Sequence, residues 1–384
     1  MSRNGGAGPI LCVVGARPNF MKIAPILRAL RGAIPPLPAR MVHTGQHYDA
    51  EMNRQFFEAL GIPDPDINLE VGSGTHAVQT AEVMRRFEPV VDRERPAAVL
   101  VVGDVNSTLA CALVAVKKNV PVIHVEAGLR SYDRAMPEEI NRVLTDQISE
   151  LLFTTEESAR QNLLREGIAD ARIHFVGNVM IDTLRQNLKN AVPPSQTLAR
   201  HGAPLHWPEK GFGVLTLHRP SNVDDPDTLR TLLGAICEVS RRIPIVFPVH
   251  PRTRAKLEQL GLRATLEGES IALLPPLGYL EMLGLMKDAR MVLTDSGGIQ
   301  EETTALGVPC VTLRNNTERP ITVEQGTNTV VGQDPTRILE VTAEILRSSG
   351  KAGRIPELWD GRASQRIAAV LRNWLDGGAA RLVA

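Results

Sequence analysis

Residues 97–128 read AAVLVVGDVNSTLACALVAVKKNVPVIHVEAG, and this stretch decides the fold. Two continuous apolar runs, AAVLVVG and VPVIHV, are typical of strands buried on both faces, at 98–102 and 120–125. Between them, 108–118 has the pattern of a helix. A buried strand, a helix and a second buried strand together predict a parallel βαβ unit.

The same alternation of strands and helices covers almost the whole chain. We expect further strands at 10–14, 40–44, 212–217, 243–249, 271–274, 290–294 and 308–313, with helices such as 20–31 and 50–60 between them. The alternation stops in the proline-rich stretch 187–210, which we interpret as a linker region. The sequence therefore predicts two Rossmann-like α/β domains, 1–186 and 211–362, with a cleft between them at the carboxyl ends of the sheets. We expect the last helix, 363–384, to pack back on the first domain.

The composition of the 384 residues argues against several classes of protein. Lys plus Arg and Asp plus Glu both number 43, so the formal net charge is zero and no nucleic-acid partner is expected. No apolar run is long enough to cross a bilayer, and residues 1–9 lack the apolar core of a signal peptide. We therefore expect a cytoplasmic protein with no membrane partner.

Cofactor motifs are absent from the sequence. The four cysteines form no CxxC pair, and the nine histidines are too scattered for metal-ligand spacing. No predicted strand is followed by GxGxxG, the fingerprint of a dinucleotide site. We therefore expect neither a metal nor an organic cofactor.

Three acidic residues of the first half are candidates for catalysis. Asp104 and Glu126 each follow a predicted strand, and Glu138 begins a predicted helix in MPEEINR. Parallel strands end at one edge of a sheet, so we expect the three carboxylates to converge there. Like charges raise one another's pKa, which suits general acid–base chemistry. Asp104 could instead cap a helix, and Glu138 could simply complement a helix dipole.

Strand ends supply basic candidates in both halves. In GARPNFMK, residues 15–22, a glycine ends a strand and a helix follows, so Arg17 and Lys22 could help to bind an anion. In LHRPSNVD, His218 could protonate or hydrogen-bond a departing phosphate. A core histidine is the alternative interpretation, and it suits His250 of PVHPR about as well as a role in the site.

The motif DSGGIQEE, residues 295–302, is the strongest candidate for nucleotide binding. Ser296, Gly297 and Gly298 open a predicted helix, whose N-terminus and dipole favour an anion. Glycines let the backbone approach a diphosphate closely. Glu302 lies further along the helix and could accept both ribose hydroxyls. A glycine-rich turn with an acidic helix start is the alternative.

Read together, these segments resemble the non-hydrolysing UDP-N-acetylglucosamine 2-epimerase family. The resemblance covers about 10–375 and rests on ten ordered motifs: GARPNFMKIAP, TGQHYD, GDVNSTLA, HVEAGLRS, MPEEINR, VGNVMIDTL, HRPSNVD, PVHPR, TDSGGIQEE and NNTERP. It implies the two-domain fold of GT-B nucleotide-sugar glycosyltransferases, a homodimer, and interconversion of UDP-N-acetylglucosamine and UDP-N-acetylmannosamine.

The resemblance also implies a role for individual residues. Contacts to UDP fall on Arg17, Lys22, Ser296, Gly297, Glu302 and Arg319, and Met282 stands where some relatives have an aromatic residue near the uracil. The groups around the sugar are Asp104, Glu126, Glu138 and His218. We expect these to eliminate UDP, form a 2-acetamidoglucal by loss of the C2 proton, and add UDP back after the proton returns to the other face.

Departures from the family pattern leave alternatives open. QHYDAEM, residues 46–52, differs from the QHREM of relatives in which this segment binds an activating second substrate molecule. HRPSNVD differs from the HRRES of some members, which leaves room for a 2,3-diacetamido uronic acid sugar. A hydrolysing epimerase, a glycosyltransferase of the same fold and a non-catalytic nucleotide-sugar sensor are the other readings.

Overall fold

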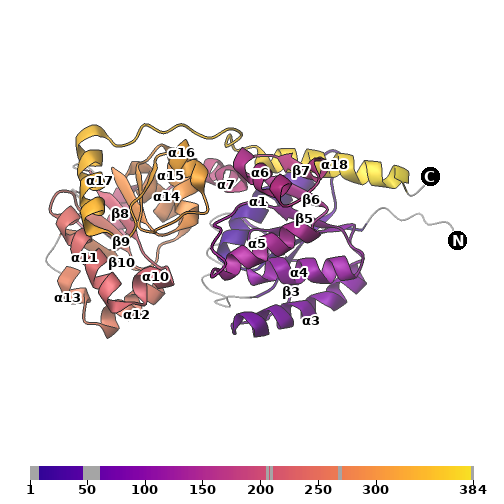
Figure 1. Ribbon diagram of the computed structural model, residues 1–384, viewed down its shortest axis with the longest axis horizontal. Helices are drawn as coiled ribbons and strands as arrows, with labels where there is room; N and C mark the ends of the chain where they lie inside the picture. The colour runs from indigo at the N-terminus through magenta and orange to yellow at the C-terminus, as the bar shows by residue number, and fades with distance from the viewer. Residues whose placement is uncertain (1–7, 46–60, 205–206, 208–210, 267–269, 382–384) are drawn as a thin grey trace. The chain divides into compact units, whose positions relative to one another are not determined.

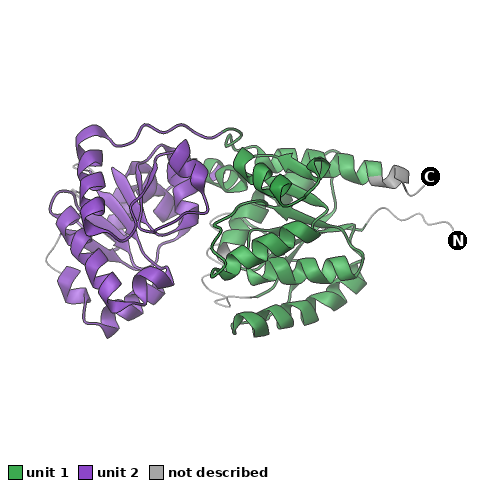
Figure 2. Cartoon of the chain, in the orientation of Figure 1, with its two compact units in different colours: residues 1–185, 357–384 green, residues 186–356 purple. Residues whose placement is uncertain are grey.

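The computed structural model describes residues 8–45, 61–204, 207, 211–266 and 270–381. The chain divides into two compact units (Figure 2): unit 1 is Met1–Arg185 with Glu357–Ala384, and unit 2 is Gln186–Pro356. Each unit contains its own parallel sheet covered by helices (Figure 1). The predicted fold class, two parallel-sheet α/β domains, is confirmed. The expected helix at 50–60 and the QHYDAEM segment lie outside the described residues.

Unit 1 has a seven-stranded parallel sheet in the order β3-β2-β1-β4-β5-β6-β7. Its strands are β1 (Ile10–Val14), β2 (Ala39–His43), β3 (Ile67–Asn68), β4 (Ala98–Val102), β5 (Val122–Val125), β6 (Leu151–Thr154) and β7 (Ile173–Phe175). Its helices are α1 (Arg17–Gly32), α3 (His76–Glu94), α4 (Asn106–Lys117), α5 (Pro137–Ile148), α6 (Glu157–Arg165), α7 (Val179–Asn187) and α18 (Ala363–Arg381). Every residue of β1, β4, β5 and β6 is buried, as the continuous apolar runs predict.

Unit 2 has a six-stranded parallel sheet in the order β10-β9-β8-β11-β12-β13. Its strands are β8 (Gly213–Thr216), β9 (Ile245–Pro248), β10 (Ile271–Leu274), β11 (Met291–Thr294), β12 (Cys310–Thr312) and β13 (Asn328–Val330). Its helices are α8 (Pro194–Arg200), α10 (Pro220–Val223), α11 (Pro226–Ser240), α12 (Pro251–Gln259), α13 (Arg263–Leu266), α14 (Tyr279–Asp288), α15 (Gly297–Leu306), α16 (Pro320–Glu324) and α17 (Pro335–Ser348).

The strand order reverses direction once in each sheet. In unit 1 the chain moves from β1 to β2 on one side and from β4 to β5 on the other. Connections between parallel strands are right-handed, so helices that follow strands on the two sides of this reversal lie on opposite faces of the sheet. Helices α3, α4 and α5 pack side by side on one face, whereas α1 packs against α18 (Figure 1). Loops at the carboxyl ends of strands separate at this reversal, where open α/β sheets bind ligands. The reversal lies between β1 and β4 in unit 1 and between β8 and β11 in unit 2.

The stretch 187–210, which we interpreted as a linker, contributes to the core of unit 2. Helix α8 lies within it, and the buried side chains Leu198 and Trp207 pack into a hydrophobic cluster with Phe212 and Leu285. The backbone N–H of Val192 donates to the carbonyl of Leu280. These apolar anchors explain why a proline-rich stretch packs against a domain.

The chain returns to unit 1 through anchored contacts. Trp359 is buried, and its indole N–H donates to the carbonyl of Thr155 at 3.0 Å. Asp182 of α7 accepts hydrogen bonds from the backbone N–H groups of Ala363 and Ser364 at the start of α18. A carboxylate at this end of a helix pairs with N–H groups that have no partner inside the helix.

Two further observations bear on the sequence predictions. All four cysteines are buried, and none of them forms a disulfide bond. Among the described residues, no helix is long and apolar enough to cross a membrane.

Candidate active site

In unit 1, the predicted residues lie near the carboxyl ends of β1, β4 and β5: Lys22 on α1, which follows β1, and Asp104 and Glu126 in the loops after β4 and β5. Asn19 ties the segment after β1 to the end of β4. Its Oδ1 accepts the N–H of Ala16 at 2.9 Å, and its Nδ2 donates to the carbonyl of Val102 at 3.1 Å. Arg17 begins α1, but its side chain lies outside the described part of the chain.

Glu126 has an unusual backbone conformation directly after β5. Its φ is +70°, in the left-handed region that residues other than glycine rarely adopt. The N–H groups of Glu126 and Ala127 both donate to the carbonyl of Phe153, each at 3.0 Å, and so hold this turn. Such a conformation costs about 1–3 kcal/mol and is kept where the surroundings or the function require it. The turn directs the Glu126 side chain to the edge where β4 ends.

Lys22 forms an ion pair with Glu126, and both side chains are almost completely buried, with 10% and 3% of their surface exposed. A Cβ on Gly103 would lie 3.2 Å from the Glu126 carboxylate and 3.4 Å from the Lys22 ammonium, and Gly103 itself has a φ of +68°. Glycine is therefore required beneath the pair. The ion pair with Lys22 holds the Glu126 carboxylate in one orientation.

Asp104 is held by α5. Its Oδ2 accepts a hydrogen bond of 2.9 Å from Arg142, and its carbonyl accepts one of 2.8 Å from Asn141. Helix α4 has Val105 as its N-cap residue, so Asp104 does not have the capping role that we weighed. A quarter of its side chain is exposed.

The two acids in the first turn of α5 have different surroundings. Glu139 is buried, accepts hydrogen bonds from Ser131 and from the backbone of Tyr132, and pairs with Arg142. Burial raises the pKa of Glu139, but these partners lower it below its ordinary value. Glu138 is only half-buried. Glu139 thus fixes the loop before α5, and Glu138 is the more accessible acid.

In unit 2, His218 and Asp295 form a hydrogen-bonded pair where β8 and β11 end. Asp295 is fully buried, and its Oδ1 lies 2.9 Å from Nδ1 of His218. Its carboxylate also accepts the backbone N–H groups of His218 and Arg219 and the side-chain amide of Asn222. Burial raises the pKa of Asp295, but His218 and these donors lower it overall. A carboxylate on Nδ1 leaves Nε2 of His218, whose side chain is 34% exposed, for proton transfer.

His250 lies against His218 and also has a local structural role. Its Nδ1 accepts the N–H of Arg252 as the N-cap of α12, and its ring centroid lies 5.5 Å from that of His218. The capping role explains a histidine at this position.

The N-terminus of α15 lies beside a cluster of arginines. Ser296 is the N-cap residue, Gly297 is buried at the first helical position, and Gly298 follows, half-buried. A Cβ on Gly297 would lie 2.6 Å from Oε1 of Glu318, whereas a Cβ on Gly298 would meet nothing within 4 Å. The two glycines therefore have different roles: Gly297 makes room for a neighbouring side chain, and Gly298 leaves open space.

Three arginines surround Glu318: Arg219, Arg314 and Arg319, which we call the arginine cluster. Arg314 pairs with Glu318 at 2.8 Å, and Arg219 lies 3.6 Å from it. Burial raises the pKa of Glu318, but the three cations lower it to about 2. Arg319 is 6% exposed and pairs with buried Glu301 at 2.7 Å. The three arginines of the cluster outnumber their two carboxylate partners, Glu301 and Glu318, so the group as a whole keeps a net positive charge.

Glu302 lies on α15 and contacts α14. It is buried, and the hydroxyl of Tyr279 donates a hydrogen bond of 2.8 Å to its Oε1. Burial raises the pKa of Glu302 to about 7; the Tyr279 hydrogen bond acts in the lowering direction and Glu301 in the raising direction. Met282, also on α14, is half-buried and packs against the hydrophobic cluster that contains Leu285.

If the UDP-sugar that the resemblance implies binds here, this pKa predicts that its affinity depends on pH. If Glu302 accepts ribose hydroxyls as a carboxylate, affinity should be weak below pH 7, rise through about pH 7 and level off above it. Tyr279→Phe removes the donor that lowers the pKa of Glu302, so the midpoint should move to higher pH. Calorimetric titration from pH 5.5 to 8.5 measures both effects. The rise should disappear in Glu302→Gln; an unchanged rise there would assign it to another group.

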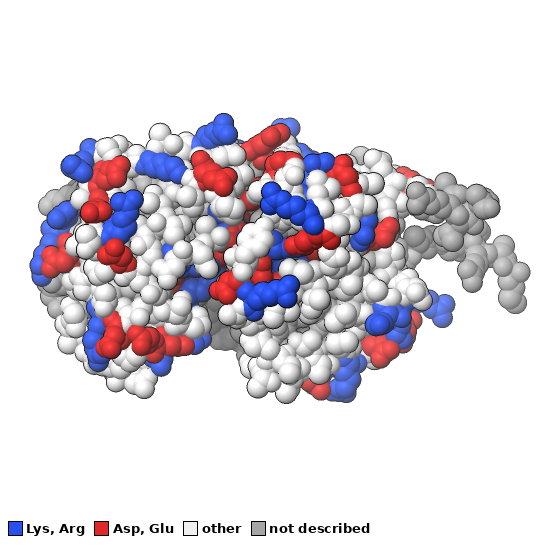
Figure 3. Space-filling view, viewed as in Figure 1, with Lys and Arg blue, Asp and Glu red and all other residues white. Residues whose placement is uncertain are grey.

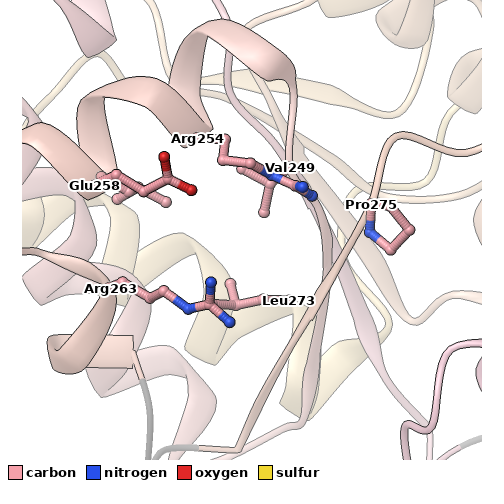
Figure 4. Close-up of a pocket in the computed structure, with 7 residues that line it drawn as sticks. Val249, Arg254, Glu258, Arg263, Leu273 and Pro275 are labelled. Atoms are coloured by element: carbon pink, nitrogen blue, oxygen red, sulfur yellow. The ribbon is translucent and has the colours of Figure 1, made fainter.

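Figure 3 shows acidic and basic side chains intermixed on the visible face, with no extended patch of one sign among the described residues. A separate surface hollow of unit 2 is lined by Val249, Arg254, Leu257, Glu258, Arg263, Leu273 and Pro275 (Figure 4). None of the predicted site residues lines it. We therefore assign the chemistry in unit 2 to the segments after β8 and β11 rather than to this hollow.

Comparisons with known proteins show the family to which the chain belongs. A family model described as UDP-N-acetylglucosamine 2-epimerase matches residues 33–372. A UDP-N-acetylglucosamine 2-epimerase of Methanococcus maripaludis is 45% identical over 340 residues, 88% of this chain and 91% of the relative. A UDP-2,3-diacetamido-2,3-dideoxy-D-glucuronate 2-epimerase of Pseudomonas aeruginosa is 42% identical over 366 residues, 94% of this chain and 99% of the relative.

A solved structure gives the same result at the level of the fold. The crystal structure of Methanocaldococcus jannaschii UDP-GlcNAc 2-epimerase in complex with UDP-GlcNAc and UDP has a TM-score of 0.85 and 42% identity, and the match covers 95% of this chain and 99% of that one. Fold and matches define an isomerase: an epimerase of nucleotide sugars with a GT-B-like pair of α/β domains. The chain belongs to the UDP-N-acetylglucosamine 2-epimerase family. The family predicted from the ordered motifs is confirmed.

Several residues around the candidate groups of each unit were missed in the sequence. They are Asn19, Glu139, Arg142, Tyr279, Asp295, Arg314 and Glu318. Asp295 carried a usable signal, because it follows a buried strand just as Asp104 does. Asn19, Arg142 and Tyr279 have no such signal, because the residues they contact, Val102, Asp104 and Glu302, are distant in sequence. Glu139 with Arg142 and Arg314 with Glu318 are opposite charges three and four positions apart, which is a local signal.

Proposed function

We propose that this chain interconverts UDP-N-acetylglucosamine and UDP-N-acetylmannosamine by eliminating UDP and adding it back. The observation that carries the proposal is Glu126: a buried carboxylate in a left-handed backbone conformation, paired with Lys22 at the carboxyl edge of the sheet. A buried, oriented carboxylate with a cationic partner is suited to act as a general base. The name and bound ligands of the Methanocaldococcus relative support the choice of substrate.

The chemistry explains why a base and an anion site are both needed. The C2 proton of the sugar is not acidic, because no carbonyl is adjacent to C2. When the C1–O bond breaks, its electron pair leaves with UDP and C1 becomes an oxocarbenium-like cation, which acidifies the C2 proton. A carboxylate takes that proton, and the C2–H electron pair becomes the C1–C2 double bond of 2-acetamidoglucal. A proton then returns to the opposite face, and UDP adds back.

We assign roles to the four candidate residues on this basis. Glu126 and Asp104 exchange the proton at C2, and the more accessible Glu138 supports or shares that role. His218, oriented by Asp295, assists the departure and return of UDP. If the wild-type protein does not exchange the C2 proton with solvent, the assignment of Glu126 and Asp104 to that proton is wrong.

Unit 2 has the features expected of a diphosphate site. The N-terminus of α15 presents free backbone N–H groups, and the arginine cluster beside it is net positive. Within the described residues, Nε of Arg219 and Nη1 of Arg314 are buried without a hydrogen-bond partner. Buried donors of this kind are costly unless a ligand satisfies them. A diphosphate is an anion that could accept from them.

Gly298→Ala tests the diphosphate site without disturbing the fold. Its Cβ would enter open space, so the melting temperature should stay the same, but it would meet a phosphate bound at this helix end. We expect UDP affinity to fall about tenfold or more, equal to about 1.4 kcal/mol. Calorimetry with UDP measures this. Gly234→Ala on α11, where a Cβ also meets nothing, is the matched control; equal affinities for the two variants would contradict the site.

The experiment that tests the function is proton NMR of the purified protein with UDP-N-acetylglucosamine in deuterated water and no added cofactor. UDP-N-acetylmannosamine with deuterium at C2 is the expected product. Free N-acetylmannosamine would show a hydrolysing epimerase instead, and an unchanged substrate would overturn this substrate assignment.

A second candidate substrate is UDP-2,3-diacetamido-2,3-dideoxy-D-glucuronate. The Pseudomonas aeruginosa relative named for this substrate is almost as similar to the chain, at 42% identity, as the Methanococcus relative at 45%. The same C2 chemistry applies to both sugars. Parallel NMR assays with the two substrates decide between them by the ratio of kcat/KM.

We further propose that the protein is a homodimer. Ile140 of α5 is 47% exposed and lines a surface hollow of unit 1 together with Ala77, Ala81 and Met84 of α3. Exposed apolar side chains gathered on one face are typical of an interface between subunits. Light scattering of the purified protein tests this, and the mass of a single chain would contradict it.

A further inference from the structure

A buried group of charges lies beneath the carboxylates of unit 1. Asp146 of α5 and His124 of β5 are fully buried, and Asp146 Oδ1 lies 2.6 Å from Nδ1 of His124. Arg130 donates to Asp146 Oδ2 at 2.7 Å and binds Glu166 through two hydrogen bonds of 2.8 and 2.6 Å. Burial raises the pKa of Asp146, but His124 and Arg130 lower it overall.

The hydrogen bonds of His124 define where its protons lie. Nε2 is 2.8 Å from the carbonyl of Gly103, and because a carbonyl only accepts, Nε2 donates. Nδ1 faces the carboxylate of Asp146, which accepts as well. The ring serves both acceptors when each nitrogen carries a proton.

This group joins the two segments that carry the candidate base residues. Gly103, whose carbonyl His124 binds, precedes Asp104. Gly128, whose N–H donates to Asp146 Oδ2 at 3.1 Å, comes two residues after Glu126. The loops after β4 and β5 are therefore both attached to one buried His–Asp pair. Charges buried in this way add little to stability compared with apolar residues, which points to a role other than stability.

We propose that His124 is a positioning residue, which holds the backbone at Gly103 and, through Asp146, at Gly128, so that Asp104 and Glu126 keep the separation needed to exchange the C2 proton. This inference rests on the proposed function. His124 makes no contact with substrate in this role; it acts through the two carboxylates. A displacement of about 1 Å in catalytic groups can reduce a rate about 100-fold.

The test compares His124→Gln with Ile123→Ala. Glutamine keeps an N–H for Gly103 but offers no second nitrogen to Asp146. Ile123 is the neighbouring residue of β5, fully buried and outside the charged group, so its truncation controls for lost stability. At a temperature where both variants are folded, we expect His124→Gln to lower kcat for C2 exchange about 10- to 100-fold, with KM for UDP-N-acetylglucosamine changed less than about threefold. Equal kcat values for the two variants would overturn the proposal.

A second measurement needs neither a folded variant nor turnover. In nitrogen NMR of the wild-type protein with labelled histidine, the His124 ring should show protons on both nitrogens. A ring with one proton would overturn the proposal. The two hypotheses fail in different ways: a wild-type protein that exchanges no C2 proton contradicts the proposed function, whereas the ring spectrum tests the buried pair directly.

Discussion

Glu126→Gln should reduce exchange of the C2 proton with solvent by about 10³-fold, within the range found when a general base is removed. Glutamine has nearly the same shape and can adopt the same left-handed turn after β5, but its amide cannot take up a proton. NMR in deuterated water measures the exchange directly. Exchange within tenfold of the wild-type rate would show that Glu126 is not the base.

The loss of the ion pair must be separated from the loss of the base. Lys22 is nearly buried, and removal of its partner leaves a cation without compensation, at a cost of about 3–5 kcal/mol of stability. Rates should therefore be compared well below the melting temperature of the variant.

Glu70→Gln is the matched control in the same unit. Glu70 also has a positive φ, +53°, but it is exposed and lies away from the carboxyl ends of β4 and β5. The same change of a glutamate in a left-handed turn should leave the exchange rate unaltered. Of these two glutamates, Glu126 alone combines this turn with burial and a buried cationic partner.

The strands were the most predictable part of the fold, because a strand buried on both faces needs a continuous apolar run. Strands β1, β4 and β10 begin and end where the sequence predicts. The proline-rich stretch 187–210 was less clear, since prolines break periodicity but do not prevent packing. Leu198 and Trp207 are the apolar side chains in it that anchor it to unit 2.

The candidate site was predictable where it depends on strand ends and not where it depends on distant pairs. Asp104, Glu126 and His218 follow strands, so the rule for parallel sheets finds them. The pair of Lys22 and Glu126 joins residues 104 positions apart, and no local pattern predicts it. The sequence also could not distinguish Glu138 from Glu139, because neighbouring residues on a helix point in different directions and only the surrounding fold decides which is buried.

The unexpected partners also change how the carboxylates work. The sequence suggested acids that repel one another, whereas the structure shows Glu126 against Lys22 and Asp104 against Arg142. In unit 2, Asp295 stands against His218. Ion pairs and hydrogen bonds therefore orient these groups, and loss of the Asp295 carboxylate in unit 2 should have a large effect on kcat.

Asp295→Asn should lower kcat for epimerisation on the order of 10²- to 10⁴-fold, as expected when the carboxylate that orients a catalytic imidazole becomes an amide. Asp295 accepts from Nδ1 of His218 at 2.9 Å and from the backbone N–H of His218 and Arg219. An amide nitrogen placed there would oppose these donors, turn the imidazole to the wrong tautomer and remove the charge that stabilises its protonated form. Steady-state kinetics with UDP-N-acetylglucosamine measures the loss.

A double-mutant cycle distinguishes an effect through His218 from general damage to the fold. If Asp295 acts through His218, His218→Asn combined with Asp295→Asn should be no slower than His218→Asn alone, within about threefold. Asp224→Asn is the control for the substitution itself, because Asp224 lies in the same HRPSNVD segment but pairs with Arg252 at the surface. Losses that multiply in the double variant would mean that Asp295 only holds the loop after β8. If the double variant is no slower than His218→Asn alone, the two residues act as one unit. In that unit the buried carboxylate of Asp295 fixes the proton on Nδ1 of His218. Nε2 is then left to give a proton to the departing UDP and to take it back when UDP returns.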